Sequence, residues 1–389
     1  MPQVAVLLEA SLGISRLMLT GILNYVRVYG PWSLNIAGGG TRDLKLPDLR
    51  QWRGSGIIGR ATTDAIARDI ASAPLPTVLF NPCDAYLAPS HPLSACGRTQ
   101  SDSPAIGRLA AEYYLGMAFR HFAFVGEVND INWSAWRREA YIARLKENGQ
   151  TCHIYPLPPR AKKTWNSERP LLCAWLHTLP KPVAIFAAND LRARQVLDAC
   201  LIADVAVPYQ AAVLGVNNDI LICETSIPPL SSIALNAEKA GYEAARMLDD
   251  LMNRRPKKRQ TFLYGPMGVI SRASTETLQV GDKLVIRALE FIRINGGLTI
   301  RVSDVAERLN VSSRWVELHF RQTLGYSVHE AIQRARMATV CAMLKDTDIS
   351  LKAISKKCGI SHPNHLCTLF KRQFGSTMSD YRERHRTQK

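Results

Sequence analysis

Charged, amide and aromatic side chains follow several of the short apolar segments in the first part of the chain. Carboxylates, amides and guanidinium groups bind hydroxyl groups, and an aromatic ring can cover the apolar face of a ligand. The sequence therefore predicts a site for a small polar molecule. The candidate residues for this site are Glu9, Ser15, Arg16, Trp133, Trp136, Arg137, Asp190 and Asn217. Two alternatives stay open: one tryptophan packs in the core, and Glu9 is merely solvated.

A second set of polar side chains is confined to two short segments near the C-terminus. Arginine can pair with guanine, asparagine with adenine, and a glutamate can accept a hydrogen bond from cytosine. The candidates for contacts with bases are Arg314, Trp315, Glu317, Pro363, Asn364, His365 and Thr368. The candidates for phosphate contacts, which position a protein without reading sequence, are Arg321, Lys371 and Arg372. Alternatively, Trp315 packs within the domain, Glu317 is solvated, and Pro363 only starts a helix.

Two helix-turn-helix units, 302–321 and 350–373, are predicted to position this second set. In the first, apolar residues recur at helical spacing before a turn at Asn310, and Ser312 is placed to cap the next helix. In the second, the turn falls at Gly359. A helix held in this way can lay its exposed face in the major groove of double-stranded DNA.

The elements that must position the first set alternate between strands and helices. We predict strands at residues 3–8, 32–37, 56–59, 77–80, 121–125, 151–155, 184–188 and 212–216. This rhythm is typical of a doubly wound parallel sheet, and two such blocks hold a ligand at the carboxyl ends of their strands. We therefore expect a two-lobed α/β domain over 1–275, a linker at 276–281 and an all-α domain over 282–389.

The α/β region resembles the sugar-sensing domain of the LacI/GalR regulators, which is related to the periplasmic binding proteins. The matching pieces are the first strand and helix, Asp102, Asn189–Asp190, residues 215–219, residues 229–233 and residues 272–275. The resemblance implies a xylose-like sugar as effector, bound in part by Arg137 and Asp190. Position 217 is usually Asp in those regulators and is Asn here, and an amide also binds hydroxyls. A non-sugar effector remains the alternative.

The helical region resembles the DNA-binding domain of the AraC/XylS regulators. The resemblance is carried by Ile354, Gly359, Ile360, Leu366, Phe370, Lys371, Phe374, Gly375 and Tyr381–Arg382. The family usually has an aromatic residue at position 366 and a proline at position 378, where this chain has Leu and Met. The resemblance implies a homodimeric activator of sugar-utilisation genes that acts on RNA polymerase. The helix predicted at 328–344 would be about 25 Å long, which could set the reading helices about one DNA turn apart.

The charge distribution agrees with a nucleic-acid partner. The chain has a formal net charge of +16, and residues 280–389 hold 19 Lys+Arg against 10 Asp+Glu. Basic segments gain affinity for DNA by releasing its counterions, although a solvated basic surface would look the same in the sequence. The basic run at 254–259 is either a solvated loop or a segment that binds phosphates. The nine cysteines lack a CxxC pair, and we find neither a signal peptide nor a membrane span, so we expect a cytoplasmic protein.

An enzyme is the main alternative class. DNA-repair alkyltransferases join a helical reader to a reactive cysteine, but no cysteine here lies in a recognisable nucleophile motif, and P-loop, GxSxG and HExxH motifs are missing. Cys358, His362, His365 and Cys367 lie close in sequence, yet their spacing is not that of a zinc site. We therefore expect no catalytic residues, no metal and no cofactor.

Overall fold

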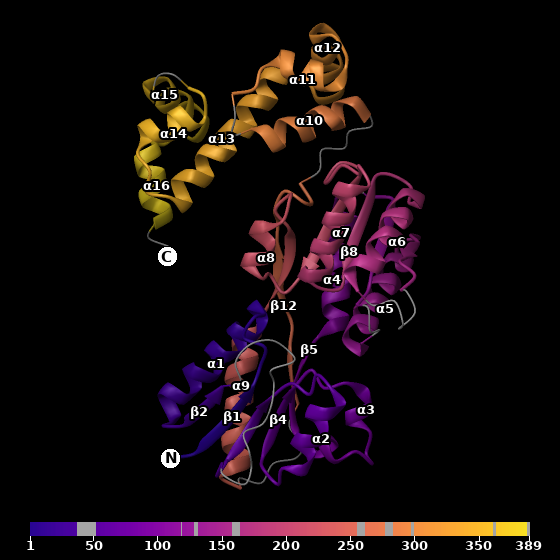
Figure 1. Ribbon diagram of the computed structural model, residues 1–389, viewed down its shortest axis with the longest axis vertical. Helices are drawn as coiled ribbons and strands as arrows, with labels where there is room; N and C mark the ends of the chain where they lie inside the picture. Colours follow the sequence, from indigo (N-terminus) through magenta and orange to yellow (C-terminus); the bar gives the residue numbers. More distant parts are fainter. Residues whose placement is uncertain are drawn as a thin grey trace. The chain divides into compact units, whose positions relative to one another are not determined.

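The computed structural model describes residues 1–36, 52–117, 119–127, 131–157, 164–254, 261–276, 283–296, 299–360 and 363–386. The chain divides into two compact units, Met1–Thr277 and Leu278–Lys389 (Figure 1). Of the expected linker, 276–281, only Glu276 falls within the described residues, and of the basic run 254–259 only Arg254 does.

The first unit contains two lobes, each built on its own sheet. In the described residues the first lobe has a six-stranded parallel sheet in the order β11-β5-β4-β3-β1-β2. Its strands are β1 (Gln3–Leu7), β2 (Ser33–Ile36), β3 (Gly56–Gly59), β4 (Thr77–Phe80), β5 (Gly97–Ser101) and β11 (Thr261–Tyr264). Its helices are α1 (Gly13–Tyr29), α2 (Asp64–Ser72), α3 (Asp84–Leu87), the 3-10 helix η2 (Pro92–Ala95) and α9 (Ala237–Met252). Because helices cover the sheet, β3 and β4 are buried at every residue.

The second lobe repeats this plan with the order β12-β10-β9-β8-β6-β7, in which only the β10–β12 pair is antiparallel among the described strands. Its strands are β6 (His121–Val125), β7 (Cys152–Ile154), β8 (Val183–Ala187), β9 (Ala211–Val216), β10 (Ser231–Leu235) and β12 (Pro266–Ile270). Its helices are α4 (Ser103–Gly116), α5 (Asn132–Glu147), α6 (Trp165–Thr178), α7 (Asp190–Ile202) and α8 (Ile220–Thr225). The predicted two-lobed, doubly wound fold class is confirmed.

The chain crosses between the lobes at three points that are hydrogen-bonded to one another. The first crossing precedes α4, the second precedes α9, and the third lies between β11 and β12. The backbone amide of Asp102 donates to the carbonyl of Tyr264 at 2.9 Å, and the backbone amide of Asn236 donates to the carbonyl of Gly265 at 3.2 Å. The lobes are therefore connected by three single-chain crossings held side by side, an arrangement typical of a hinge.

Helices α1 and α9 of the first lobe approach each other to backbone contact through two glycines (Figure 1). A Cβ atom added at Gly21 would lie 1.8 Å from the carbonyl oxygen of Glu238, and one at Gly241 would lie 1.9 Å from that of Met18. Beside this contact the Tyr25 hydroxyl donates to Asp249 at 3.2 Å. A residue larger than glycine at either position would force the helices apart.

The second unit is all-helical in its described residues. Its helices are α10 (Lys283–Asn295), α11 (Val302–Leu309), α12 (Ser313–Leu324), α13 (Val328–Asp346), α14 (Leu351–Lys357), α15 (Pro363–Phe374) and α16 (Met378–Arg386). The predicted turn at Asn310 is confirmed, because its φ is 56°. Ser312 caps α12 as predicted by accepting from the Trp315 amide at 3.2 Å. Gly359, with φ +65°, makes the second turn.

The same helical unit is built twice, and α12 corresponds to α15 with an offset of fifty positions in the sequence. Val316 and Phe320 are buried in α12, and Leu366 and Phe370 are buried at the corresponding places in α15. Corresponding glycines also end both helices in the left-handed conformation, Gly325 with φ 75° and Gly375 with φ 69°. The two copies therefore share a core pattern and differ mainly in the residues they expose.

Phe374, one of the residues that carry the AraC/XylS resemblance, is 39% exposed. It lies at the end of α15, where its ring is 4.5 Å from that of Phe370 and 6.0 Å from that of Tyr381. The ring therefore packs against two aromatic neighbours although the residue is partly in solvent.

The contact between α1 and α9 gives a test of the first lobe. Gly241→Ala should lower the free energy of unfolding by about 1–3 kcal/mol, because its new methyl group meets the backbone of the opposite helix. Urea unfolding of the purified protein measures this change. Gly116→Ala is the matched control, since a Cβ there would meet nothing within 4 Å. Equal unfolding midpoints for the two variants would contradict the close packing of α1 on α9.

Candidate functional site

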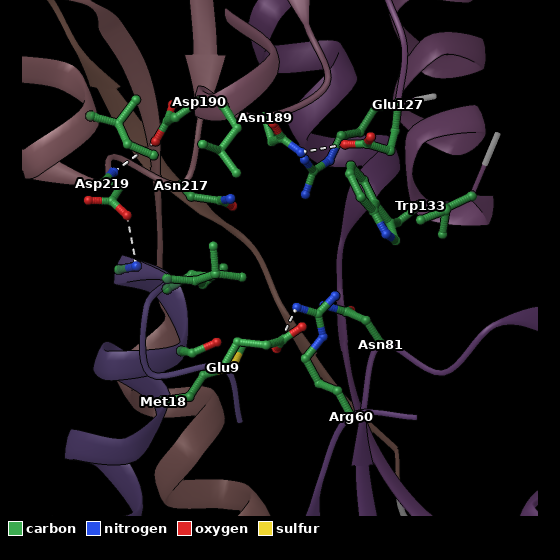
Figure 2. Close-up of a pocket in the computed structure, with 18 of the residues that line it drawn as sticks. Glu9, Met18, Arg60, Asn81, Glu127, Trp133, Asn189, Asp190, Asn217 and Asp219 are labelled. Atoms are coloured by element: carbon green, nitrogen blue, oxygen red, sulfur yellow. Dashed lines mark hydrogen bonds and ion pairs between the residues drawn. The ribbon is translucent and has the colours of Figure 1, made fainter. Parts of the chain in front are cut away.

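A cavity of about 240 Å³ lies between the two lobes of the first unit (Figure 2). Its polar lining comes mainly from residues that directly follow the strands of both sheets, where open α/β sheets bind ligands. In Figure 2, Glu9, Met18, Arg60 and Asn81 of the first lobe face Glu127, Asn189, Asp190 and Asn217 of the second. The volume is below the roughly 300–1,000 Å³ of pockets for drug-sized ligands, so the cavity suits a small polar molecule.

The structure brings together six of the eight predicted residues in this cavity. The residues that line it are Glu9, Ser15, Trp133, Arg137, Asp190 and Asn217. Arg16 does not line it, because its side chain is 43% exposed and its guanidinium donates to the carbonyls of Ala10 and Ser11. Trp136 does not line it either. Trp133 and Arg137 are four residues apart and share one face of α5, whereas Trp136 is turned away from Arg137 by about 100°.

Arg137 is the buried cation of the cavity. Only 4% of it is exposed, its guanidinium donates to the carbonyl of Ala188, and its Cζ lies 4.8 Å from the centre of the Trp133 ring. Burial lowers the pKa of Arg137 to about 10, against the opposing charges of Tyr264 and Asp190, so the group stays protonated at neutral pH. Its Nε has no hydrogen-bond partner among the described residues. A buried donor of this kind gains from a ligand acceptor.

Asp190 is the most deeply buried carboxyl group of the cavity, with 1% of the residue exposed. Its two oxygens accept from the Ser232 hydroxyl at 2.6 Å and from the Asp219 amide at 2.7 Å. Burial raises the pKa of Asp190 to about 7, although both hydrogen bonds favour the ionised form. Near neutral pH this carboxyl group can therefore either accept a hydrogen bond from a ligand or donate one.

Asp219 joins the two lobes directly. It caps α8 in the second lobe, where its Oδ1 accepts from the Leu221 amide at 3.2 Å. Its Oδ2 accepts from the Gly13 amide in the first lobe at 2.7 Å (Figure 2). Arg16 of the first lobe lies 3.8 Å from Oδ1. These contacts close one side of the cavity.

A second bridge joins the lobes near α3 and α5. The Asn132 side chain donates to Asp84 at 3.0 Å and to the carbonyl of Pro82 at 3.4 Å. With the bridge at Asp219, it shows that the lobes are closed in this structure.

Several polar residues of the cavity were not predicted from the sequence. They form cross-linked pairs: Arg60 with Glu9 at 3.3 Å, Asn81 with the Tyr264 hydroxyl at 2.7 Å, and Glu127 with Asn189 at 2.9 Å. Arg60, Asn81 and Glu127 each come within two residues after a predicted strand, as Glu9 does. Their position directly after a predicted strand, which made Glu9 a candidate, would therefore have identified them as well. Asp219, by contrast, is recognisable only from its contact with the other lobe.

A buried ion pair supports the loop that carries Glu127. Arg192 of α7 pairs with Glu168 of α6, and both residues are almost fully buried. The Arg192 Nε also donates to the carbonyl of Gly126 at 2.8 Å. Because removing one member would leave the other charge buried and unpaired, this pair fixes the position of the loop.

In the first reading helix, α12, the predicted residues have different surroundings. Arg314 and Arg321 are exposed. Trp315 is half-buried and stacks on His319, with ring centres 3.6 Å apart. The Glu317 carboxylate accepts from the Val328 amide at 3.3 Å and so joins α12 to the start of α13. This contact gives Glu317 a structural role that the sequence did not reveal.

In the second reading helix, α15, the predicted residues are mostly accessible. Those that are exposed are Asn364, His365, Thr368, Lys371 and Arg372. Pro363 is half-buried at the first position of the helix, where proline is well tolerated. The Thr368 hydroxyl donates to the carbonyl of Asn364 at 2.9 Å.

Two of the thiol groups are shifted away from the reactive thiolate form. Burial raises the pKa of Cys152 and of Cys223 to about 12, the opposite of the shift that creates a reactive thiolate. Within the described ranges, no group of three His, Cys, Asp or Glu side chains could hold a metal ion. His362, which the zinc alternative required, lies outside them. None of the helices in the described part of the chain has both the length and the apolar character needed to span a bilayer.

Comparisons with protein families agree with this division of the chain. Residues 111–275 match the periplasmic binding protein-like domain, and residues 305–384 match the helix-turn-helix domain. The xylose operon regulatory protein of Haemophilus influenzae is 31% identical over 284 residues, which cover 72% of this chain and 73% of that protein. Its counterpart in Escherichia coli K12 is 26% identical over 386 residues, covering 98% and 97%.

A solved structure is similar over the same extent. It is described as the xylose-binding transcription activator XylR, has a TM-score of 0.85 and 26% identity, and is matched over 98% of this chain and 97% of its own. The sensor and reader resemblances inferred from the sequence are therefore confirmed. From its two matched domains and its similarity to relatives of the same architecture, the chain belongs to the family of the xylose operon regulatory proteins.

Proposed function

We propose that this protein is a sugar-responsive activator of transcription. A small xylose-like sugar binds in the cavity of residues 1–275, and residues 282–389 bind double-stranded operator DNA. The names of the relatives, which regulate xylose operons, support the choice of sugar. The protein then acts in the cytoplasm as a homodimer that recruits RNA polymerase, and it has no catalytic activity.

The observation that carries this proposal is the chemistry of the closed cavity. A sugar hydroxyl both donates and accepts hydrogen bonds, and the cavity offers carboxyl groups, two arginines and the amides of Asn81, Asn189 and Asn217. The Trp133 ring and Met18 supply apolar surface for the ring carbons. Asn217 replaces the aspartate expected from the LacI/GalR resemblance, and its amide can serve as donor and acceptor to the same hydroxyl.

Sugar binding would be transmitted by closure of the lobes. A ligand against Asp190 and Asn217 contacts the same loop that carries Asp219, the residue that holds Gly13 of the other lobe. The ligand therefore favours the closed form, in which these contacts exist together. A coupling of about 1–3 kcal/mol between sugar and DNA binding would change the DNA affinity by about 5- to 150-fold.

On the DNA side, we propose that Arg314, Asn364, His365 and Thr368 contact bases, while Arg321, Lys371 and Arg372 contact phosphates. All of these side chains are exposed. We assign structural roles within the domain to Trp315, Glu317 and Pro363 instead. Trp315 stacks on His319, Glu317 holds the start of α13, and Pro363 opens α15.

Two results would favour the alternative functions. Methyl transfer from alkylated DNA to a cysteine, detected by mass spectrometry, would replace the proposed regulator with a repair enzyme. Stabilisation by a non-sugar metabolite, with none by any sugar, would retain the regulator and change its effector.

Thermal unfolding with a panel of pentoses, hexoses and sugar acids tests the sensor. A pentose such as xylose should raise the midpoint, because a ligand of the native state stabilises it. Arg137→Lys, which keeps the charge but loses the guanidinium fork, should weaken that binding about tenfold or more. Arg144→Lys, on the same helix and outside the cavity, should bind normally. A sugar that shifts both variants equally would contradict the role of Arg137.

The pKa of Asp190 gives the unliganded protein a specific pH dependence. Its folded value, about 7, is above the ordinary value of 3.8, so the folded state keeps a proton that the unfolded state releases between these pH values. Asp190 therefore lowers stability as pH rises through this window, by a few kcal/mol at most, since one pKa unit corresponds to about 1.4 kcal/mol. Asp190→Asn should gain stability relative to wild type between pH 5 and pH 8.

Urea unfolding at the two pH values measures this difference. Asp198→Asn serves as the control, because Asp198 is an exposed carboxylate on the same helix, and it should show no such gain. A difference between Asp190→Asn and wild type that is the same at pH 5 and pH 8 would rule out the raised pKa.

Arg314→Ala tests the reading role of α12. If Arg314 pairs with a guanine, its loss should weaken operator binding by about 1–3 kcal/mol and relax the preference at one position. Binding to a systematic set of single-base operator variants measures both effects. Arg287→Ala removes an exposed arginine of α10 and should leave the preference profile intact. An Arg314→Ala profile identical to that of wild type would exclude a base contact.

A further inference from the structure

The exposed face of α12 carries a large apolar residue between two arginines. Arg314, Leu318 and Arg321 are spaced by four and three residues, which places them on one side of the helix. Val316 and Phe320 are buried on the other side. Leu318 is 53% exposed, so its methyl groups lie on the surface from which the flanking arginines project.

The second reading helix has a methyl-bearing residue at the corresponding place. With the offset of fifty positions, Leu318 corresponds to Thr368 of α15. Thr368 is also exposed, with Asn364 one turn before it and Lys371 one turn after it. Its hydroxyl donates to the Asn364 carbonyl at 2.9 Å, so the hydroxyl proton is used within the helix and the methyl group can contact another molecule.

Thymine is the base that presents a methyl group in the major groove, and aliphatic side chains and the threonine methyl contact it. We propose that Leu318 and Thr368 each contact the methyl group of a thymine, one in each of the two segments of DNA that the chain reads. This inference rests on the proposed function and assigns part of its sequence specificity. A thymine is then required at the corresponding place in both segments.

Charge favours DNA over a protein as the occupant of this face. The exposed groups that flank Leu318 are Arg314 and Arg321, and those near Thr368 are Lys371 and Arg372. A surface that carries cations around an aliphatic side chain fits a groove lined by phosphates, whose floor displays methyl groups. If a second copy of this chain bound here through the same face, the cations of the two copies would repel one another.

Replacing thymine with deoxyuridine removes only the methyl group and therefore tests the contact directly. Full-length protein, with the stabilising sugar, is first used to select duplexes from a random library. Each thymine of the selected duplex is then replaced in turn, and affinities are measured for wild type and Leu318→Ala. For wild type, one replacement should weaken binding about fourfold, the factor for one buried methyl group. For Leu318→Ala, that replacement should have no effect.

Thr368 allows an even smaller change. Thr368→Ser removes the methyl group and keeps the hydroxyl, so it should abolish the sensitivity at a second thymine, roughly ten base pairs from the first. Thr368→Val keeps a methyl group at this place and loses the hydroxyl, so the sensitivity should remain. Ile294→Ala, which trims a 55% exposed apolar residue of α10, is the control for Leu318 and should behave as wild type.

The outcomes separate this inference from the proposed function. If the protein selects no DNA sequence, the proposed function fails. If it selects a sequence but Leu318→Ala and Thr368→Ser remain as sensitive as wild type to every replacement, only the methyl contacts are overturned. A selected sequence without a preferred thymine in either segment also overturns them. A change in oligomeric state for Leu318→Ala, with unchanged sensitivity to deoxyuridine, would assign this face to a protein contact.

Discussion

The closed form of the first unit depends on a chain of hydrogen bonds that begins inside the cavity and ends in the opposite lobe. Asp190 accepts from the Asp219 amide, and the Asp219 carboxylate accepts from the Gly13 amide. A Cβ at Gly13 would lie 2.7 Å from the Asp219 carboxyl carbon, so a larger residue there would displace this carboxylate. Asp190 in the cavity thus holds Asp219, and Asp219 in turn contacts the other lobe. The three hydrogen-bonded crossings are the chain's connections between the same two lobes.

Much of this arrangement could be predicted from the sequence. Apolar runs that end in polar residues located the strands and the side of the sheets where Glu9, Arg137 and Asp190 meet. The strands β5 and β10 were harder to predict because they include polar residues such as Thr99, Ser231 and Ser232, which become buried only through hydrogen bonds and tertiary packing. The partners of Asp219 and Tyr264 could not be predicted either, because they lie 206 and 183 residues away in the chain.

In the helical unit, local sequence preferences were sufficient to predict the turns and helix caps, but not the roles of the surface residues. Asn310 and Ser312 mark the first turn because the conformations they favour are local properties. Glu317 looked like a base-reading residue because it lies beside the exposed side of α12, and its contact with Val328 arises only when α12 and α13 pack. Leu318 was overlooked because an apolar residue in a helical pattern is normally assigned to the core.

The duplicated helical unit has a consequence for the direction of binding. Its two copies share buried residues, yet they expose Arg314 in one and Asn364 in the other. With the base contacts proposed for these two residues, one chain reads different bases with its two copies, and the recognised sequence then has a direction that fixes the orientation of the bound protein. A single chain could in this way set the orientation in which the protein faces a promoter, without relying on asymmetry between two subunits.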